Sequence, residues 1–284
     1  MPEGASTIAT SDLPAPRTAP RPHGPLSYSG PPRGWRRLAQ RLHLPTLLLL
    51  ALGLWAWSAV SGRFGPYLFP PPGRVLSGLA GIVADGQLWV HVGASLSRIG
   101  LGFGAAVAVS VLAGLLGAAL PWARQVLRDL TAVLNSTSVF VWIVLALIWF
   151  GLSDRGPVFT TFMIVLPVLL SNVGAGVDGV DRRLLEMAQV YRLSALDRFR
   201  HVTLPSTVPY LVAGMQVAFA LGLRVSVVAE LFGVSAGIGY AMNFSRDTLR
   251  TDLVFAWALV LIAVMVLTEK LVFEPLSRRA SAWR

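Results

Sequence analysis

Residues that commonly carry catalysis are few in this chain and form no recognisable site. There is no cysteine, which excludes disulfides, thiolate metal sites and cysteine nucleophiles. The four histidines lie apart in the sequence, at positions 23, 43, 91 and 201. The His-Glu-x-x-His zinc motif is absent. The only lysine, Lys270, follows Glu269, whereas the phosphate-binding loop of an ATPase places a lysine after glycine. The sequence therefore predicts no catalytic residue, metal site or cofactor in this chain.

A charged stretch, EMAQVYRLSALDRFRHVTLP, lies between two apolar runs and covers Glu186 to Pro205. Asp181 is placed to cap a short helix that ends near Arg192. Ser194, followed by an aspartate three residues later, resembles a capping box and starts a second helix. Pro205 lacks an amide hydrogen and should separate that helix from the next apolar run. The predicted helix-turn-helix elbow either folds back on its own bundle or docks a partner, and its two capped helices favour docking.

Long apolar runs surround the elbow and place the chain in a membrane. Charged residues make up 13% of the 284 residues and the mean hydropathy is +0.63, both unusual for a water-soluble protein. The runs do not alternate apolar and polar residues, so membrane-spanning strands are not expected. The expected fold is an all-α membrane protein with about six transmembrane helices, at Leu44–Ser61, Ile99–Leu120, Leu130–Gly151, Pro157–Val177, Thr207–Phe232 and Leu253–Phe273.

Arginine residues outside these spans are concentrated on one face, which predicts both termini and the elbow in the cytoplasm. We expect a disordered Pro/Arg-rich tail over 1–40, a first span and an external amphipathic helix over 41–98, and a transmembrane core over 99–284 with the elbow at 181–205. Trp89 would anchor the external helix at the outer interface. The basic loops are expected to meet membrane lipid. No basic helix interleaved with aromatics is present, so no nucleic-acid partner is expected.

Two spans carry small residues at intervals of four, which lets helix backbones approach closely. Such rows either pack the bundle of one chain or form a surface that shifts between transport states, including a contact with a second permease. The row in the second span is Gly102, Ala106, Ser110, Gly114 and Ala118, and the row in the fifth is Gly214, Ala218, Gly222 and Ser226.

Arg224 is the one arginine deep inside a span, and it points away from the small-residue row of its helix. It lies in the outer half of the span, near Glu230. One interpretation is that Arg224 and Glu230 belong to the translocation pathway, where the arginine draws in an anionic substrate. The other is that Arg224 forms a structural ion pair with Glu230 or with a residue on another span.

The elbow resembles the coupling loop of ABC importer permeases, the EAA motif. That pattern is Glu-Ala-Ala, three residues, Gly, nine residues, Ile, any residue, Leu-Pro. The matching positions here are Glu186, Ala188, Val202, Leu204 and Pro205, while Met187 replaces the second alanine and Arg192 replaces the glycine. If the turn at position 192 requires a positive φ, an arginine there costs about 1 kcal/mol or more.

The resemblance extends from about Leu68 to the C-terminus. The stretches LFPPPGRVLSGL, HVGASLSRIGLGF, LIWFGLSD, VVAELFG and GIGYAMNFSRD are similar to permeases that import nitrate, taurine and aliphatic sulfonates. That subfamily usually carries prolines before the WFG equivalent of its third span. This chain has Ser138, Val139 and Val144 there instead, so pore details and substrate identity are not carried over.

The resemblance implies a type I ABC importer permease bundle with cytoplasmic coupling helices, in a bacterial inner membrane. It also implies a second permease copy as a homodimer, two cytoplasmic ATP-binding subunits that bind ATP and Mg, and an extracytoplasmic substrate-binding protein. The expected cargo is a small anionic solute. The alternative is an ion-coupled secondary transporter, which usually shows internal repeats and several ionisable groups within its spans.

Overall fold

The computed structural model describes residues 46, 50, 53–57 and 69–281. The chain divides into two compact units, 1–52 and 53–284, and the helical bundle belongs to the second. The predicted tail over 1–40 and most of the first predicted span lie outside the described residues. All regular elements of the described part are helical.

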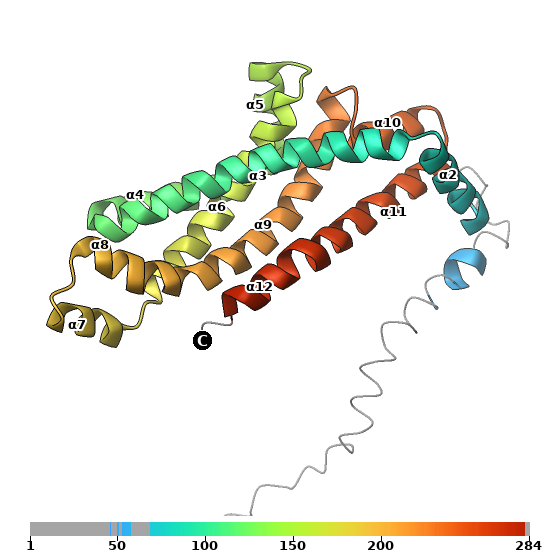
Figure 1. The fold of residues 1–284 in the computed structure, drawn as a ribbon. Coiled ribbons are helices and arrows are strands. Elements are labelled where there is room, and N and C mark those ends of the chain that lie inside the picture. Colours follow the sequence, from blue (N-terminus) through green and yellow to red (C-terminus); the bar gives the residue numbers. More distant parts are fainter. Residues whose placement is uncertain (1–45, 47–49, 51–52, 58–68, 282–284) are drawn as a thin grey trace, which may run out of the picture. The chain divides into compact units, whose positions relative to one another are not determined.

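The described helices run in the order shown in Figure 1, where coloured ribbons follow the chain from teal to red. Two short π-helical turns, η1 and η2, lie inside longer helical segments. The elements are α2 (Pro72–Ala84), α3 (Gln87–Ala119), α4 (Pro121–Ser136), α5 (Val139–Phe150), α6 (Arg155–Asp178), α7 (Arg182–Val190), α8 (Ala195–Arg198), η1 (Phe199–Thr203), α9 (Leu204–Gly233), α10 (Ile238–Asp247), α11 (Thr251–Thr268), η2 (Glu269–Phe273) and α12 (Glu274–Ser281).

Four helical segments of the described residues are long and apolar enough to cross a membrane: Gln87–Ala118, Arg155–Asp178, Phe199–Gly233 and Thr251–Ala280. They correspond to the second, fourth, fifth and sixth predicted spans. The second begins at Gln87, whereas the sequence prediction began it at Ile99, because the preceding residues are polar enough to lower the local hydropathy but still continue the helix. The helix therefore includes Trp89, which is exposed.

The third predicted span, Leu130–Gly151, is not one straight helix. α4 and α5 meet at a bend of 91°, at the polar stretch Asn135–Ser138. The hydroxyls of Ser136 and Thr137 both donate to the carbonyl of Val133, at 2.8 and 3.1 Å. These side chains give the backbone an alternative to the helical ladder, and Ser138 is extended, with φ −66° and ψ 144°. A hydropathy pattern does not register such a break.

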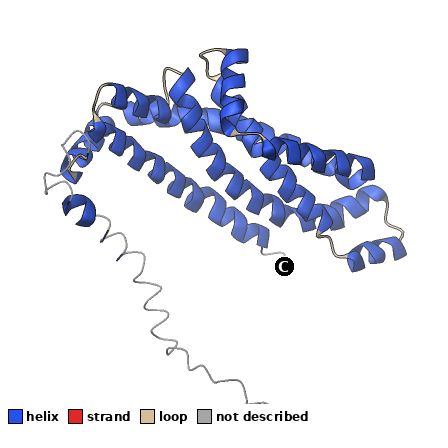
Figure 2. Ribbon diagram, turned by 180° about the vertical axis from the view of Figure 1, so that it is seen from behind, coloured by secondary structure: helices blue, strands red, loops and turns tan. Residues whose placement is uncertain are grey.

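α6 is the central helix of the second unit. It packs against α3 and α9 along most of its length and against α4 and α5 on a third side. Ala106, Val165, Leu169 and Ala218 form the core between α3, α6 and α9. Figure 2, seen from behind, shows α6 and α9 running together while α5 stands out from the other helices.

The predicted amphipathic helix is present as α2, which begins in the proline run at Pro71 and Pro72. Val75 and Ile82 are buried against Ile238 and Trp257 of α10 and α11. The bundle has two ends that differ in what they hold. The elbow end carries α7 and α8, and the far end carries α10 and residues 151–154.

Candidate functional site

The first elbow helix begins where the sequence predicted. The carboxylate of Asp181 accepts a hydrogen bond from the amide of Arg183 at 2.9 Å, so it caps α7. An N-cap of this kind satisfies one of the amides that lack a partner in the first turn. The predicted N-cap is confirmed.

α7 ends in a Schellman motif centred on Arg192. The amide of Leu193 donates to the carbonyl of Ala188 at 3.0 Å, and the amide of Arg192 donates to that of Gln189 at 2.9 Å. Arg192 has φ +53°, the left-handed region in which glycine is preferred at this position. An arginine there costs about 1 kcal/mol relative to glycine. The turn therefore keeps the glycine conformation and carries strain instead of being reshaped.

The second elbow helix is capped by Ser194. Its hydroxyl accepts from the amide of Asp197 at 3.1 Å and donates to the carboxylate of the same residue at 2.6 Å. In a capping box the carboxylate would accept from the backbone amide of the cap residue; here it accepts from the hydroxyl of Ser194 instead. α8 is only four residues long and leads directly into η1.

The prediction that Pro205 separates the elbow from the fifth span was wrong. α8, η1 and α9 form one continuous helical segment, and Leu204 is helical with φ −62° and ψ −50°. The amide of Leu204 reaches back five residues to Phe199, and the hydroxyl of Ser206 donates to the carbonyl of Val202 at 2.7 Å. The π-helical turn leads directly into α9, and Pro205 lies in the first turn of α9, where a residue without an amide hydrogen is tolerated.

The residues of the coupling motif divide by burial. Ala188 and Val202 are buried in a small core with Val180 and the half-buried Leu185. The others are exposed: Glu186, Met187, Arg192, Leu204 and Pro205. Two members of the motif therefore hold the elbow together, and five face outward.

Apolar side chains cover the outer surface of α7. Met187, Tyr191 and Val190 are exposed, Val190 by 81%. Large apolar side chains that remain exposed next to charged residues are typical of a surface that another protein covers. The elbow end therefore exposes an apolar surface that is built on a small buried core.

At the far end, Glu230 lies in a buried charge cluster with Arg98 of α3. Glu230 is 1% exposed and Arg98 is 5% exposed. Their side chains meet through Nη1 and Oε1 at 3.1 Å. The guanidinium also pairs with Asp154 at 2.8 Å and donates to the carbonyl of Ala236 at 2.7 Å. Three acceptors from separate parts of the chain thus surround one arginine.

The second carboxylate oxygen of Glu230 is also fully engaged. It accepts from the hydroxyl of Ser95 at 2.8 Å and from the amide of Gly239 at 2.9 Å. Such complete hydrogen bonding is what a buried charge requires. Since Ser95 in turn accepts from the amide of Ile238 at 2.9 Å, and His91 from that of Gly237 at 3.1 Å, the cluster ties the start of α10 to α3.

Two glycines make this close approach possible. Gly237 has φ +130°, a conformation that residues with a Cβ rarely adopt. A Cβ on Gly239 would collide with the carbonyl oxygen of Val227. The backbone at the start of α10 therefore lies directly against α9.

Arg224 is not part of this cluster. Its side chain is exposed, and within the described residues it has no ion pair. The alternative that paired Arg224 with Glu230 is incorrect, because Arg98 occupies that carboxylate. Arg224 thus remains an exposed charge inside a membrane-spanning segment, on the side of α9 away from α6.

The sequence prediction missed Arg98 as a partner of Glu230. A usable signal was present, because His91, Ser95 and Arg98 are spaced i, i+4, i+7 and share one helical face. It was overlooked because the predicted span began at Ile99, after all three.

Both small-residue rows face α6 within one chain, apart from Ala118, which is exposed. A Cβ on Gly102 would lie 2.6 Å from the carbonyl oxygen of Val158, and one on Gly214 would lie 2.6 Å from the Cβ of Asn172. Gly114 and Gly222 approach α6 in the same way, and Ala106, Ser110, Ala218 and Ser226 are fully buried. At these positions the rows pack α3 and α9 against their neighbour α6.

Within the part of the chain that the structure describes, no group of three or more His, Asp or Glu residues is close enough to hold a metal ion.

Comparison with known proteins places these features in a family. A sequence profile of the family described as "Binding-protein-dependent transport system inner membrane component" matches residues 93–273. The chain is 27% identical over 260 residues to the taurine transport system permease protein TauC of Escherichia coli K12, covering 87% of this chain and 94% of that protein. It is 28% identical over 241 residues to the nitrate import permease protein NrtB of Leptolyngbya laminosa, covering 81% and 84%.

A putative aliphatic sulfonates transport permease protein, SsuC of Escherichia coli K12, is 28% identical over 214 residues, covering 75% of this chain and 81% of that protein. Among solved structures, the chain resembles one described as "Crystal structure of an amino acid ABC transporter with histidines". The TM-score is 0.57 at 19% identity, over 71% of this chain and 97% of that chain. At this identity the likeness concerns the fold.

Proposed function

Because the chain belongs to the binding-protein-dependent transport system inner membrane component family, we propose that it forms the translocation pathway of an ATP-driven ABC importer for a small anionic solute. Members of this family are the transport permease components of such systems and are not themselves catalytic. Membership does not favour the alternative of an ion-coupled secondary transporter. The observation that carries the proposal is the elbow, an exposed apolar surface of α7 on a buried core, continuous through η1 with a membrane-spanning helix.

The elbow is the point at which force enters the permease. Two ATP-binding subunits, which bind ATP and Mg, dock on the exposed Met187 and Val190 and move as they bind and hydrolyse ATP. The buried Ala188 and Val202 keep α7 in contact with η1, so a displacement of α7 shifts the start of α9. The pathway then opens alternately to each side, while the chemistry stays in the partner.

The cargo is a small anion of the sulfonate or nitrate kind. Relatives with these substrates in their names cover most of this chain. Arg224 supports an anionic cargo, because an exposed guanidinium within a span is costly unless it faces water or an anion. Glu230 contributes indirectly, by fixing the far end beside that pathway.

In this proposal the chain lies in a bacterial inner membrane, with the elbow and both termini on the cytoplasmic side. A second copy of this permease completes the pathway as a homodimer, and an extracytoplasmic substrate-binding protein delivers the solute to the far end. Membrane lipid surrounds the remaining apolar faces. The domain organisation is a tail over 1–40, a first span and amphipathic helix over 41–98, and the permease core over 99–284.

The docking proposal is tested with Met187→Cys, which is the only cysteine in the resulting protein because the native chain has none. A crosslinker with one thiol-reactive and one photoreactive end, used in intact cells, should capture a nucleotide-binding protein at this position. Thr248→Cys, which is exposed at the far end, is the matched control and should not capture it. Absence of the nucleotide-binding protein from the Met187→Cys product, at normal permease levels, would refute the proposal.

The substrate role of Arg224 is tested separately by Arg224→Gln. Uptake of a radiolabelled alkyl sulfonate in cells should fall at least about tenfold, as expected when a charge-assisted contact is lost. Normal uptake with normal permease levels would remove Arg224 from the pathway and leave the docking proposal intact.

A further inference from the structure

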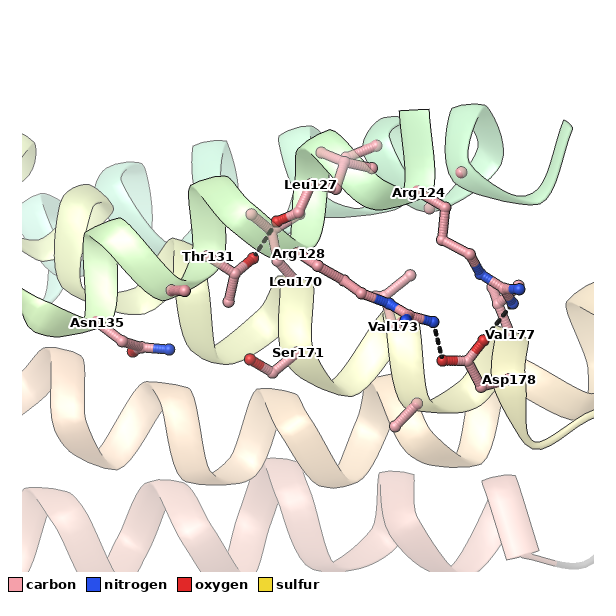
Figure 3. Close-up of a pocket in the computed structure, with 16 residues that line it drawn as sticks. Arg124, Leu127, Arg128, Thr131, Asn135, Leu170, Ser171, Val173, Val177 and Asp178 are labelled. Carbon is pink, nitrogen blue, oxygen red and sulfur yellow. Dashed lines mark hydrogen bonds and ion pairs between the residues drawn. The ribbon is translucent and has the colours of Figure 1, made fainter. Parts of the chain in front are cut away.

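A pocket of about 430 Å³ lies between α3, α4 and α6 at the elbow end of the bundle. Figure 3 shows it in close-up, with Arg124 and Arg128 of α4 extending toward Asp178 of α6. The volume is in the range of pockets that hold small ligands. Neither Arg224 nor Glu230, the residues predicted to belong to the pathway, lines this pocket, whereas Gly114, predicted to pack helices, does.

Small residues line part of the other walls of the pocket, beside larger apolar residues such as Leu127 and Leu170. Gly114 and Gly117 come from α3, and Gly174 and Ala175 come from α6. A Cβ on Gly174 would meet no atom within 4 Å. A larger side chain at position 174 would therefore extend into the pocket.

The charges at one end of the pocket do not balance. Arg124 and Arg128 both pair with Asp178, Arg128 through Nη2 at 3.0 Å. Two guanidiniums against one carboxylate leave one positive charge. The three side chains are 38%, 58% and 43% exposed, so a solute in water can reach them and compete with the carboxylate.

Unused donors face the same space. Each guanidinium carries five N–H donors, and each makes only one ion-pair contact with Asp178. Asn135, further along α4, also lines the pocket, and its side chain makes no hydrogen bond within the described residues. The planar, charged donors of the two guanidiniums are suited to the oxygen atoms of a sulfonate, a nitrate or a phosphate diester.

We propose that this pocket is a binding site for a singly charged oxyanion, with Arg124 and Arg128 as its charged ligands. The inference rests on the proposed function, since the cargo of an anion importer supplies such a ligand at the cytoplasmic end of the pathway. An anionic lipid head group has the same chemistry. Asp178 is the internal competitor, which holds the arginines when the pocket is vacant and is displaced when an anion binds.

The position of Asp178 connects the site to the elbow. It is the last residue of α6 and lies three residues before Asp181, the cap of α7. A movement of the elbow therefore moves Asp178 relative to α4. Return of the carboxylate to the two arginines would then expel the bound anion on the cytoplasmic side.

Protection of a single cysteine provides the test, in the full chain reconstituted in nanodiscs of zwitterionic lipid. Ala175→Cys lines the pocket one turn from Asp178, and N-ethylmaleimide, which is uncharged, reports its accessibility. Ethanesulfonate at ten times its Kd should slow labelling about tenfold, whereas ethylammonium should have no effect. Ser235→Cys, exposed in the loop at the far end, should label at the same rate with either ion.

Two sets of variants in the Ala175→Cys background separate binding from a structural role. Asp178→Asn and the double variant Arg124→Gln/Arg128→Gln break the same ion pairs between α4 and α6. An anion site predicts opposite results, because Asp178→Asn frees the arginines and should retain or increase protection, whereas the double variant should lose it. Equal loss in both would show that the arginines act only through the ion pairs, and would overturn the proposal.

A steric variant provides independent evidence. Gly174→Leu places a side chain in the pocket and should abolish protection with both arginines present. Gly104→Leu is the matched control, because Gly104 is also a helical glycine with open space around its Cβ and lies outside the pocket. Full protection in Gly174→Leu would mean that the anion binds elsewhere.

Labelling in nanodiscs of different lipid composition shows whether the bound anion is a lipid head group or a free solute. If phosphatidylglycerol in the nanodisc slows labelling without ethanesulfonate, and the double arginine variant removes the effect, the site takes a head group. If ethanesulfonate protects in zwitterionic lipid, it takes a free solute. If neither ethanesulfonate nor phosphatidylglycerol slows labelling, the proposed anion site is refuted. The proposed function would not be affected, because crosslinking at Met187 to the ATP-binding subunit tests it independently.

Discussion

Two clusters of arginine and carboxylate lie at opposite ends of the bundle and use the same chemistry in different surroundings. At the far end, Arg98 and Glu230 are almost completely buried and every charged oxygen of Glu230 has a partner. At the elbow end, Arg124, Arg128 and Asp178 are partly exposed and unequal in charge. A buried pair cannot exchange its partner cheaply, whereas an exposed pair can.

The difference suggests a division of labour along the helices. The far-end cluster holds the start of α10 against α3 and α9, so these three helices keep one fixed arrangement. The ion pairs of the elbow-end cluster stabilise the contact between α4 and the end of α6 only weakly, so the two helices can move relative to each other. Variants at the far end should therefore change stability more than variants at the elbow end.

Glu230→Ala should have the largest effect. It leaves the guanidinium of Arg98 buried with one partner fewer, and loss of one partner of a buried pair costs about 3–5 kcal/mol. Thermal unfolding of the purified chain in nanodiscs measures the loss. Glu274→Ala, which breaks the exposed pair with Arg278, should cost less than about 1 kcal/mol. Similar shifts for the two variants would contradict the contrast.

Gly239→Ala tests the same region without removing a charge. Its new Cβ would collide with the carbonyl of Val227 and press on Glu230, and overpacking of this kind costs about 1–3 kcal/mol. Gly81→Ala in α2, where a Cβ meets nothing within 4 Å, is the control for an unobstructed helix position. If both variants unfold at the temperature of the native chain, the close contact between α10 and α9 is not required.

Arg192→Gly should stabilise the elbow. Relief of the positive φ is expected to gain about 1 kcal/mol, which corresponds to about fivefold slower hydrogen exchange for the amides of α7. Tyr191→Gly is the control, because Tyr191 has φ −76° and glycine there should speed exchange. Faster exchange in Arg192→Gly would mean that the arginine side chain makes a contact worth more than the backbone strain.

Asp178→Asn should have the smallest effect on stability. Its ion pairs are partly exposed, and pairs of this kind contribute less than about 1 kcal/mol. Thermal unfolding under the conditions used for Glu230→Ala provides the comparison. A loss as large as that of Glu230→Ala would show that both clusters are fixed structural contacts.

Local features of the fold were predictable from the sequence because their causes are local. The all-α membrane architecture and the type I permease fold followed from hydropathy and from the elbow motif, and the comparisons confirm them. The caps at Asp181 and Ser194 were predictable because a side chain and an amide two or three residues away decide them.

Features that depend on distant residues were not predictable in the same way. Arg98 and Glu230 are 132 residues apart, and only the packing of α3 on α9 brings them together. The bend at Ser138 was missed because hydropathy averages over polar residues inside an apolar run. The continuity through Pro205 was missed because the π-helical turn η1 leads directly into α9 and leaves the proline in the first turn of that helix. The proposed anion pocket depends on how α3, α4 and α6 pack together. No pattern of residues in the sequence predicts that packing.

The continuous helix from Phe199 to Gly233 has a mechanical consequence. Its 35 residues correspond to about 50 Å at 1.5 Å per residue, and the elbow adjoins one tip while Glu230 lies near the other. A lever arm of that length converts a tilt of a few degrees at its base into a displacement of several ångström at its tip. The elbow and the proposed solute entrance would therefore be coupled through this one helix, whose natural bending points are η1 and Pro209.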